Sequence, residues 1–256
     1  MARKKALAVI SFGTSYPEAR RAIETLEHRL SQAMPEYDFY RAFTSQMIIR
    51  KIQREEGTVI PNPAELVEQL RQQGYEEIVC QSLHVIPGIE YEKMCRQIRQ
   101  AAGDLCVRIG KPMLYTQEDY LETCTALLEE MPVLKPDEAF VYMGHGTEHA
   151  VNAAYSQVEN TFRYLDAERV YVGTVEGFPE LDYIKKRLQK HHIRKVWLAP
   201  FMIVAGDHAQ NDLAGAESDS WKSQLEADGY ETEVCLRGMG ECPKIGALFE
   251  AHCMRA

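Results

Sequence analysis

The hydrophobic pattern of the chain alternates between short apolar runs and longer stretches in which apolar residues recur every three or four positions. Apolar runs of four to eight residues are typical of strands that are covered on both faces of a sheet, and the periodic stretches are typical of amphipathic helices. This alternation predicts parallel βαβ units. The expected strands are residues 6–12, 37–43, 77–83, 105–109, 139–143, 170–174, 195–203 and 231–236.

Helical patterns fill the segments between these strands. The first follows Ser15 and Pro17, a cap candidate and a residue suited to a first helical turn. The others cover residues 46–55, 64–73, 91–102, 117–131, 150–165, 180–191, 218–228 and 245–253. A proline-containing stretch at 132–137 is a candidate linker, and 256 residues suit two domains. The expected domains are therefore residues 1–131 and 132–256.

Two strand-end loops occur twice in the sequence. Ser11-Phe12-Gly13-Thr14 matches Gly144-His145-Gly146-Thr147, and residues 80–90 match residues 198–208, with Glu90 opposite His208. We interpret the chain as two similar doubly wound α/β domains related by pseudo-two-fold symmetry, the first with an extra helix at 62–73. Because ligands bind at the carboxyl ends of parallel strands, we expect an active-site cleft between the domains.

Composition restricts the partners and the compartment. The net charge of −9 argues against nucleic acid or an anionic membrane as the main partner. The seven cysteines include no CxxC pair, which predicts reduced thiols. The basic start is followed by only about seven apolar residues, too few for a signal peptide, and no run of about 20 apolar residues occurs. We expect a cytoplasmic protein.

Four ionisable residues lie just after predicted strands, namely Glu90, His145, Glu176 and His208. Imidazole and carboxylate together suit zinc, cobalt, nickel or iron. Two histidines and one carboxylate with an open position are typical of a working metal site. Simpler interpretations remain, because Glu90 and Glu176 could each cap a helix.

Other chemistry has less support in the sequence. His84 lies in an apolar run and is expected to pack in the interior. The loop at Ser11, Phe12, Gly13 and Thr14 could hold an anion at a helix start, but neither GxGxxG nor GxxxxGK[ST] is present. No Ser-His-Asp or Cys-His set has a recognisable local motif.

The motifs that surround these residues resemble those of a known enzyme family. They are residues 11–15, 81–84, 90–93, 144–147, 175–177, 206–212 and 238–241. In this order they are similar to the anaerobic (class II) sirohydrochlorin cobaltochelatases, the CbiK family, over essentially the whole chain. The resemblance implies a chelatase-like pair of α/β domains and ATP-independent insertion of cobalt(II) into sirohydrochlorin during cobalamin synthesis.

The resemblance also assigns roles to residues. It implies that His145, Glu176 and His208 bind the metal, and that His145 and Glu90 are catalytic. The tetrapyrrole is expected to bind near Ser11, Phe12, Gly13 and Thr14, with no cofactor beyond the substrate metal. Arg50, Lys51 and Arg54 are weaker candidates for holding the carboxylates of the substrate.

Two alternatives remain at this point. Sirohydrochlorin ferrochelatases use a similar site, so iron insertion for sirohaem is a rival activity. A metal or tetrapyrrole carrier without turnover is a rival of another class. The sequence leaves open the cellular metal, the proton acceptor and whether the chain forms a homo-oligomer.

Overall fold

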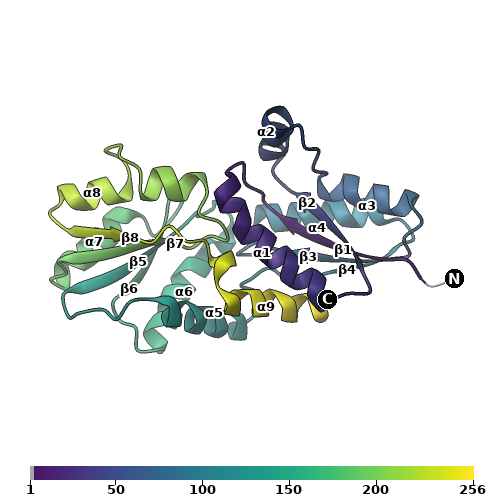
Figure 1. The fold of residues 1–256 in the computed structure, drawn as a ribbon. Coiled ribbons are helices and arrows are strands. Elements are labelled where there is room, and N and C mark those ends of the chain that lie inside the picture. Colours follow the sequence, from purple (N-terminus) through teal and green to yellow (C-terminus); the bar gives the residue numbers. More distant parts are fainter. Residues whose placement is uncertain (1–2) are drawn as a thin grey trace. The chain divides into compact units, whose positions relative to one another are not determined.

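The computed structural model describes residues 3–256, which divide into two compact units (Figure 1). The first unit ends at Tyr115 and also includes Pro243–Ala256, and the second is Thr116–Cys242. Each unit contains one sheet of four parallel strands flanked by helices. The predicted α/β class with two parallel sheets is therefore confirmed.

The first sheet has the strand order β2-β1-β3-β4, so the chain first steps outward from β1 and then crosses back over it. Right-handed crossovers then place α1 on the opposite face from α3 and α4. The strands are β1 (Lys5–Ser11), β2 (Asp38–Phe43), β3 (Glu77–Ser82) and β4 (Cys106–Ile109). The helices are α1 (Pro17–Ala33), α2 (Gln46–Glu56), α3 (Pro63–Gln72), α4 (Ile89–Ala102) and α9 (Pro243–Met254).

Burial on both faces explains why β1 is apolar almost throughout. Ala6, Ala8 and Ile10 pack in one cluster with side chains of α3 and α4. Leu7 and Val9 are also buried, and because side chains alternate along a strand they face the opposite side of the sheet.

The second sheet has the equivalent order β6-β5-β7-β8. Its strands are β5 (Glu138–Gly144), β6 (Val170–Thr174), β7 (Lys195–Pro200) and β8 (Glu231–Val234). Its helices are α5 (Gln117–Glu130), α6 (Ala153–Tyr164), α7 (Leu181–Lys190) and α8 (Trp221–Ala227), with 3₁₀ turns η1 (Ala150–Asn152) and η3 (Met239–Glu241). A π-helical turn, η2 (Ala209–Leu213), follows β7 in a segment for which the sequence predicted no helix.

Backbone hydrogen bonds show that the two units repeat one design. In the first unit the N–H of Ser45 donates to the carbonyl of Phe12 (3.3 Å), and in the second the N–H of Glu176 donates to the carbonyl of His145 (2.7 Å). Phe12 and His145 are thus equivalent, as the sequence repeat predicted.

The second pair of repeated loops agrees in the same way. The N–H of Glu92 donates to the carbonyl of Gly88 in one unit, and the N–H of Gln210 donates to that of Gly206 in the other. This register makes Glu90 the counterpart of His208. The pseudo-two-fold relation between the halves and the cleft stay predictions.

The extra helix of the first unit is α2, and the prediction that it is the helix at 62–73 is wrong. Phe43 donates its N–H to the carbonyl of Pro61, as Thr174 does to that of Pro179. Helix α3 therefore corresponds to α7, and α2 is the insertion. Both segments have a helical pattern, so the sequence alone did not distinguish the inserted helix from the common one.

The division into units differs from the boundary expected at residues 131 and 132. Helix α5 packs against α6 of the second unit, and α9 packs against α1 and β3 of the first. The proline-containing segment after α5 leads directly into β5 of the same unit.

Two further properties concern the chain as a whole. Within residues 3–256, no helix has the length and apolar character needed to cross a membrane. All seven cysteines are free thiols; five are buried, and Cys106 and Cys235 are exposed.

Candidate active site

His145 lies in the loop that follows the fully buried strand β5. Steric constraints explain why a glycine lies on each side of His145. A Cβ at Gly144 would lie 2.2 Å from the ring of Tyr155, and a Cβ at Gly146, where φ is +85°, would lie 2.2 Å from the carbonyl of Glu176. These close approaches leave the imidazole at the carboxyl edge of the sheet with 45% of its side chain exposed.

Glu176 is held next to His145 by the backbone. Its N–H bond to the carbonyl of His145 extends the pairing of β5 with β6 beyond the strand ends. A carboxylate oxygen of Glu176 lies 3.8 Å from Nδ1 of His145. Helix α7 begins at Leu181 with Glu180 as its N-cap, so Glu176 does not cap it.

Asn152 connects the two loops, and sequence reasoning did not single it out. Its Oδ1 accepts a hydrogen bond from the N–H of Thr147 (3.0 Å), and its Nδ2 donates to the carbonyl of Phe178 (2.6 Å). It therefore fixes the His145 loop to the Glu176 loop. A lone asparagine in a 3₁₀ turn has no sequence signature that would reveal this role.

His208 reaches the same place from the end of β7. Its ring lies edge-on to that of His145, with centroids 4.5 Å apart. Its Nδ1 is 2.6 Å from the carboxylate of Asp212, one turn further along the π-helical segment. π-Helical turns occur often at functional sites. An acid four residues after the histidine is the signal that identifies Asp212.

The hydrogen bonds determine which imidazole nitrogen is free. The carbonyl oxygen of Gly146 lies 2.9 Å from Nδ1 of His145 and can only accept a hydrogen bond. The carboxylate of Asp212, which contacts Nδ1 of His208, likewise only accepts one. Both histidines then carry their proton on Nδ1 and keep a lone pair on Nε2. A carboxylate or carbonyl behind the second nitrogen is the usual support of a metal-binding histidine.

Tyr155, on helix α6, supports the loop that carries His145. It is buried, and its hydroxyl accepts a hydrogen bond from the N–H of Gly146 at 3.3 Å. Burial raises the pKa of the Tyr155 phenol, so this residue stays neutral at physiological pH.

The three proposed metal ligands do not form a closed cage. Their side chains are all partly exposed, at 45% for His145, 63% for Glu176 and 33% for His208. Among residues 3–256, no group of three His, Cys, Asp or Glu side chains already has the spacing of a metal site. The arrangement is an open pair of imidazoles beside a carboxylate.

The other predicted residues lie in the first unit. Glu90 is in the first turn of α4, where its Oε1 is 3.3 Å from the ammonium of Lys93. Its Oε2 is buried and has no hydrogen-bond partner in the described part of the chain. The position also suits an acid near a helix N-terminus, so both interpretations of Glu90 fit the geometry.

The loop at Ser11–Thr14 is tightly packed apart from one exposed ring. Ser11 and Thr14 are buried, and Phe12 is 45% exposed. Gly13 has φ of +93°, and a Cβ there would lie 2.5 Å from the ring of Phe43. The loop therefore presents one aromatic surface at the carboxyl edge of the first sheet.

His84 is buried, as expected. Its Nδ1 lies 2.8 Å from the hydroxyl of Ser82, and its Nε2 lies 3.5 Å from that of Thr44. Burial lowers the pKa of His84 to about 4, so it is neutral at physiological pH.

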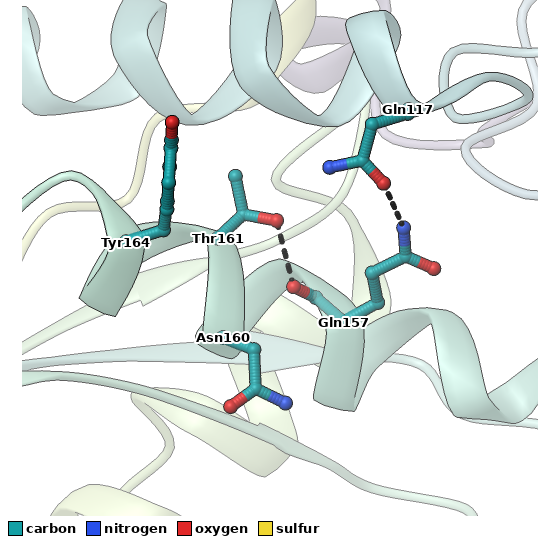
Figure 2. A pocket seen from close by; sticks show the side chains of 5 residues that line it. All are labelled: Gln117, Gln157, Asn160, Thr161 and Tyr164. Carbon is teal, nitrogen blue, oxygen red and sulfur yellow. Dashed lines mark hydrogen bonds between the residues drawn. The ribbon is translucent and has the colours of Figure 1, made fainter.

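A hollow of about 200 Å³ lies between α5 and α6, and neither histidine of the pair lines it (Figure 2). It is lined by Gln117, Gln157, Asn160, Thr161 and Tyr164. The amide of Gln157 donates to Oε1 of Gln117 at 3.3 Å. Because its lining has no carboxylate, imidazole or cation, this hollow offers no metal ligands of the kind found at the edge of β5.

Solved structures identify the class of fold. The chain superposes on SirB from Bacillus subtilis with Fe³⁺ with a TM-score of 0.67 and 12% identity, covering 98% of this chain and 95% of that one. For CbiX, described as the terminal enzyme of sirohaem biosynthesis in denitrifying bacteria, the TM-score is 0.60 with 16% identity, covering 98% and 99% of the two chains. The protein has the chelatase fold.

Sequence comparison identifies the family within this class. The model of the cobalt chelatase family CbiK matches residues 5–256. The sirohydrochlorin cobaltochelatase of Salmonella typhimurium is 42% identical, covering 99% of this chain and 96% of that protein. The sirohydrochlorin cobaltochelatase CbiKC of Nitratidesulfovibrio vulgaris is 32% identical, with coverage of 93% and 85%. The chain belongs to the CbiK cobalt chelatase family, as its motifs predicted.

Proposed function

We propose that this enzyme inserts cobalt(II) into sirohydrochlorin in the anaerobic synthesis of cobalamin. The observation that carries the proposal is the pair of imidazoles of His145 and His208, 4.5 Å apart, each with Nδ1 engaged and Nε2 free. Membership of the CbiK family supports cobalt as the metal and sirohydrochlorin as the macrocycle.

In the proposed reaction the metal replaces two pyrrole N–H protons, so one Co²⁺ enters and two H⁺ leave. No bond to phosphate is made or broken, and the reaction needs no ATP. Neutral imidazoles of His145 and His208, with the carboxylate of Glu176, hold the incoming cobalt. Because these side chains are partly exposed and form no closed cage, they suit a metal that must be passed on to the macrocycle.

Proton removal needs a base with a lone pair that is not already engaged in a hydrogen bond. We assign this role to Glu90, and to His145 once its Nε2 has released the cobalt to the macrocycle. Oε2 of Glu90 has no hydrogen-bond partner within residues 3–256, and its burial makes that lone pair costly to leave unused. The ammonium of Lys93 contacts Oε1 of Glu90 at 3.3 Å and leaves Oε2 unoccupied.

The macrocycle itself is assigned to the loop of the first unit. The exposed ring of Phe12 offers an apolar surface for a flat tetrapyrrole. In the repeat, this ring takes the place of His145, so the two units have diverged at equivalent positions.

The free cysteines agree with action in the reducing cytoplasm.

The test is incubation of the metal-free protein with sirohydrochlorin and cobalt, iron or nickel, followed by absorbance. We expect many turnovers per chain, fastest with cobalt. A single stoichiometric binding event would identify a carrier instead. Faster insertion of iron than of cobalt would assign the protein to sirohaem synthesis.

A further inference from the structure

The inserted helix α2 has no counterpart in the second unit, and its two ends and its inner face each have their own contacts. Ser45 caps it by accepting the N–H of Ile48 on its hydroxyl (3.4 Å), and Gly57 ends it with a left-handed φ of +68°. Its inner face has a small apolar core of its own, formed by Phe43, Ile49, Ile52 and Ile60.

An ion pair fixes the far end of the helix. The guanidinium of Arg20 on α1 makes two hydrogen bonds to the carboxylate of Glu56, at 2.8 and 2.6 Å. The side chain of Arg20 is only 12% exposed, so this contact is partly shielded from solvent. A bidentate pair of this kind orients as well as attracts. The position of α2 is therefore determined at both ends and along its inner face.

The outer face of α2 has a cationic surface on a chain whose net charge is −9. Met47, Arg50, Lys51 and Arg54 line a hollow of about 550 Å³. Within the described residues, Arg50 and Lys51 have no ion pair or hydrogen bond, and the ammonium of Lys51 lies over the ring of Tyr16, 5.6 Å from its centroid. Arg54 pairs with the neighbouring Glu55 at 3.1 Å. Two cations are thus left without a carboxylate.

The adjoining loop is the one assigned to the tetrapyrrole. The N–H of Ser45, the cap of α2, donates to the carbonyl of Phe12. The ring of Phe43 lies in the apolar core of α2 and also covers Gly13. The cationic face and the exposed ring of Phe12 thus belong to one continuous piece of the first unit.

We propose that the outer face of α2, consisting of Met47, Arg50, Lys51 and Arg54, anchors the acetate and propionate carboxylates of the tetrapyrrole. This inference rests on the proposed function. A macrocycle such as sirohydrochlorin is flat and apolar in the middle and surrounded by carboxylates. The first unit offers an aromatic ring at one point and unpaired cations on the neighbouring helix. The insertion thereby selects polycarboxylate macrocycles over those with few acidic side chains.

The test uses the full chain with Arg50→Gln, Lys51→Gln and Arg54→Gln combined. We expect the KM for sirohydrochlorin to rise about tenfold, since exposed ion pairs contribute modestly and three are removed. The kcat and the cobalt affinity should stay near their original values. The rise in KM with added salt, expected for the unmodified enzyme, should flatten in the variant.

The matched control removes three exposed cations of the second unit, Lys186→Gln, Lys190→Gln and Arg194→Gln, and should leave the KM unchanged. Restoring the charge with Arg50→Lys in place of Arg50→Gln should recover part of the affinity. A porphyrin with only two propionates should lose much less affinity on removal of the α2 cations than sirohydrochlorin does.

The outcomes separate the two proposals. Binding of metal-free sirohydrochlorin is read from its fluorescence without cobalt, so it does not depend on turnover. If the unmodified enzyme inserts cobalt but the α2 variant keeps the original KM and Kd, the anchoring role is wrong and the chelatase assignment stands. If no insertion occurs with any metal, the proposed function fails whatever the α2 variant does.

Discussion

At the scale of single residues, His145 is the side chain on which the proposed chemistry depends most directly. The change His145→Ala removes one imidazole and its free Nε2, and we expect cobalt insertion to fall below about one hundredth of the original rate. The fold should survive, because nearly half of the side chain is exposed and it packs little. Turnover is measured with purified protein whose circular dichroism matches the original. Near-original turnover would remove His145 from the site.

Glu90 and His208, equivalent in the repeat, should separate in their effects. Glu90→Gln keeps the shape and removes the negative charge, so turnover should fall more than cobalt affinity does. His208→Ala should do the opposite and weaken cobalt affinity more than it lowers turnover. Calorimetric titration of cobalt into both variants, alongside turnover rates, distinguishes the roles. Equal loss of cobalt affinity would make Glu90 a ligand.

His84 predicts a pH dependence of stability. Its pKa is about 4 in the folded chain against 6.5 ordinarily, so between these values the unfolded chain binds a proton that the folded chain does not. The free energy of unfolding should therefore be highest above pH 6.5 and fall by up to about 3 kcal/mol as the pH approaches 4.

Denaturant titrations at several pH values measure this slope. His84→Gln should flatten it, although the variant loses its hydrogen bonds and is less stable at neutral pH. The control His28→Gln, at an exposed position of α1, should keep the original slope. An unchanged slope in His84→Gln would assign the pH dependence to other groups.

At the scale of elements, the insertion α2 should open independently of the sheet. Ile52 is fully buried in the small core under α2, and Ile52→Ala is expected to cost about 2–5 kcal/mol there. Hydrogen exchange of the α2 amides should speed up while that of β1 stays slow, and the KM for sirohydrochlorin should rise. Uniform acceleration across the first unit would show that α2 is part of its main core.

The sequence predicted the strands and most helices because their signal is local. Buried runs such as that of β5 and the cap-and-proline start of α3 are specified by neighbouring residues. What it missed depends on register or on distant packing. The insertion of α2 shows only in the bonds from Phe43 to Pro61, and the placement of α9 with the first unit depends on contacts with α1 and β3.

For the candidate site, the sequence predicted the residues at the strand ends but not the residues that support them. His145, Glu176 and His208 follow strands of one sheet, and parallel strands bring their carboxyl ends to one edge. Their supports were not predictable. Asn152 acts through two backbone groups, and Asp212 pairs with His208 because a π-helical turn follows β7.

At the scale of the whole molecule, the two units repeat one loop design but carry different side chains at equivalent positions. Equivalent loops present His145 with Glu176 in one unit and Phe12 with Ser45 in the other. Imidazole and carboxylate suit a divalent metal, whereas an aromatic ring and a hydroxyl do not. The second unit is therefore expected to determine cobalt affinity, and the first to determine tetrapyrrole affinity.

A pair of variants at equivalent positions tests this division. Phe12→Ala should raise the Kd for metal-free sirohydrochlorin about tenfold, because it removes an apolar ring surface, and should leave cobalt affinity unchanged. His145→Ala should do the reverse. In the double variant the loss of binding free energy for each ligand should equal the loss in the corresponding single variant within about 0.5 kcal/mol, since each ligand is measured in the absence of the other. A loss of cobalt affinity in Phe12→Ala would mean that the first unit also holds the metal, and that the two halves have diverged less than their loops indicate.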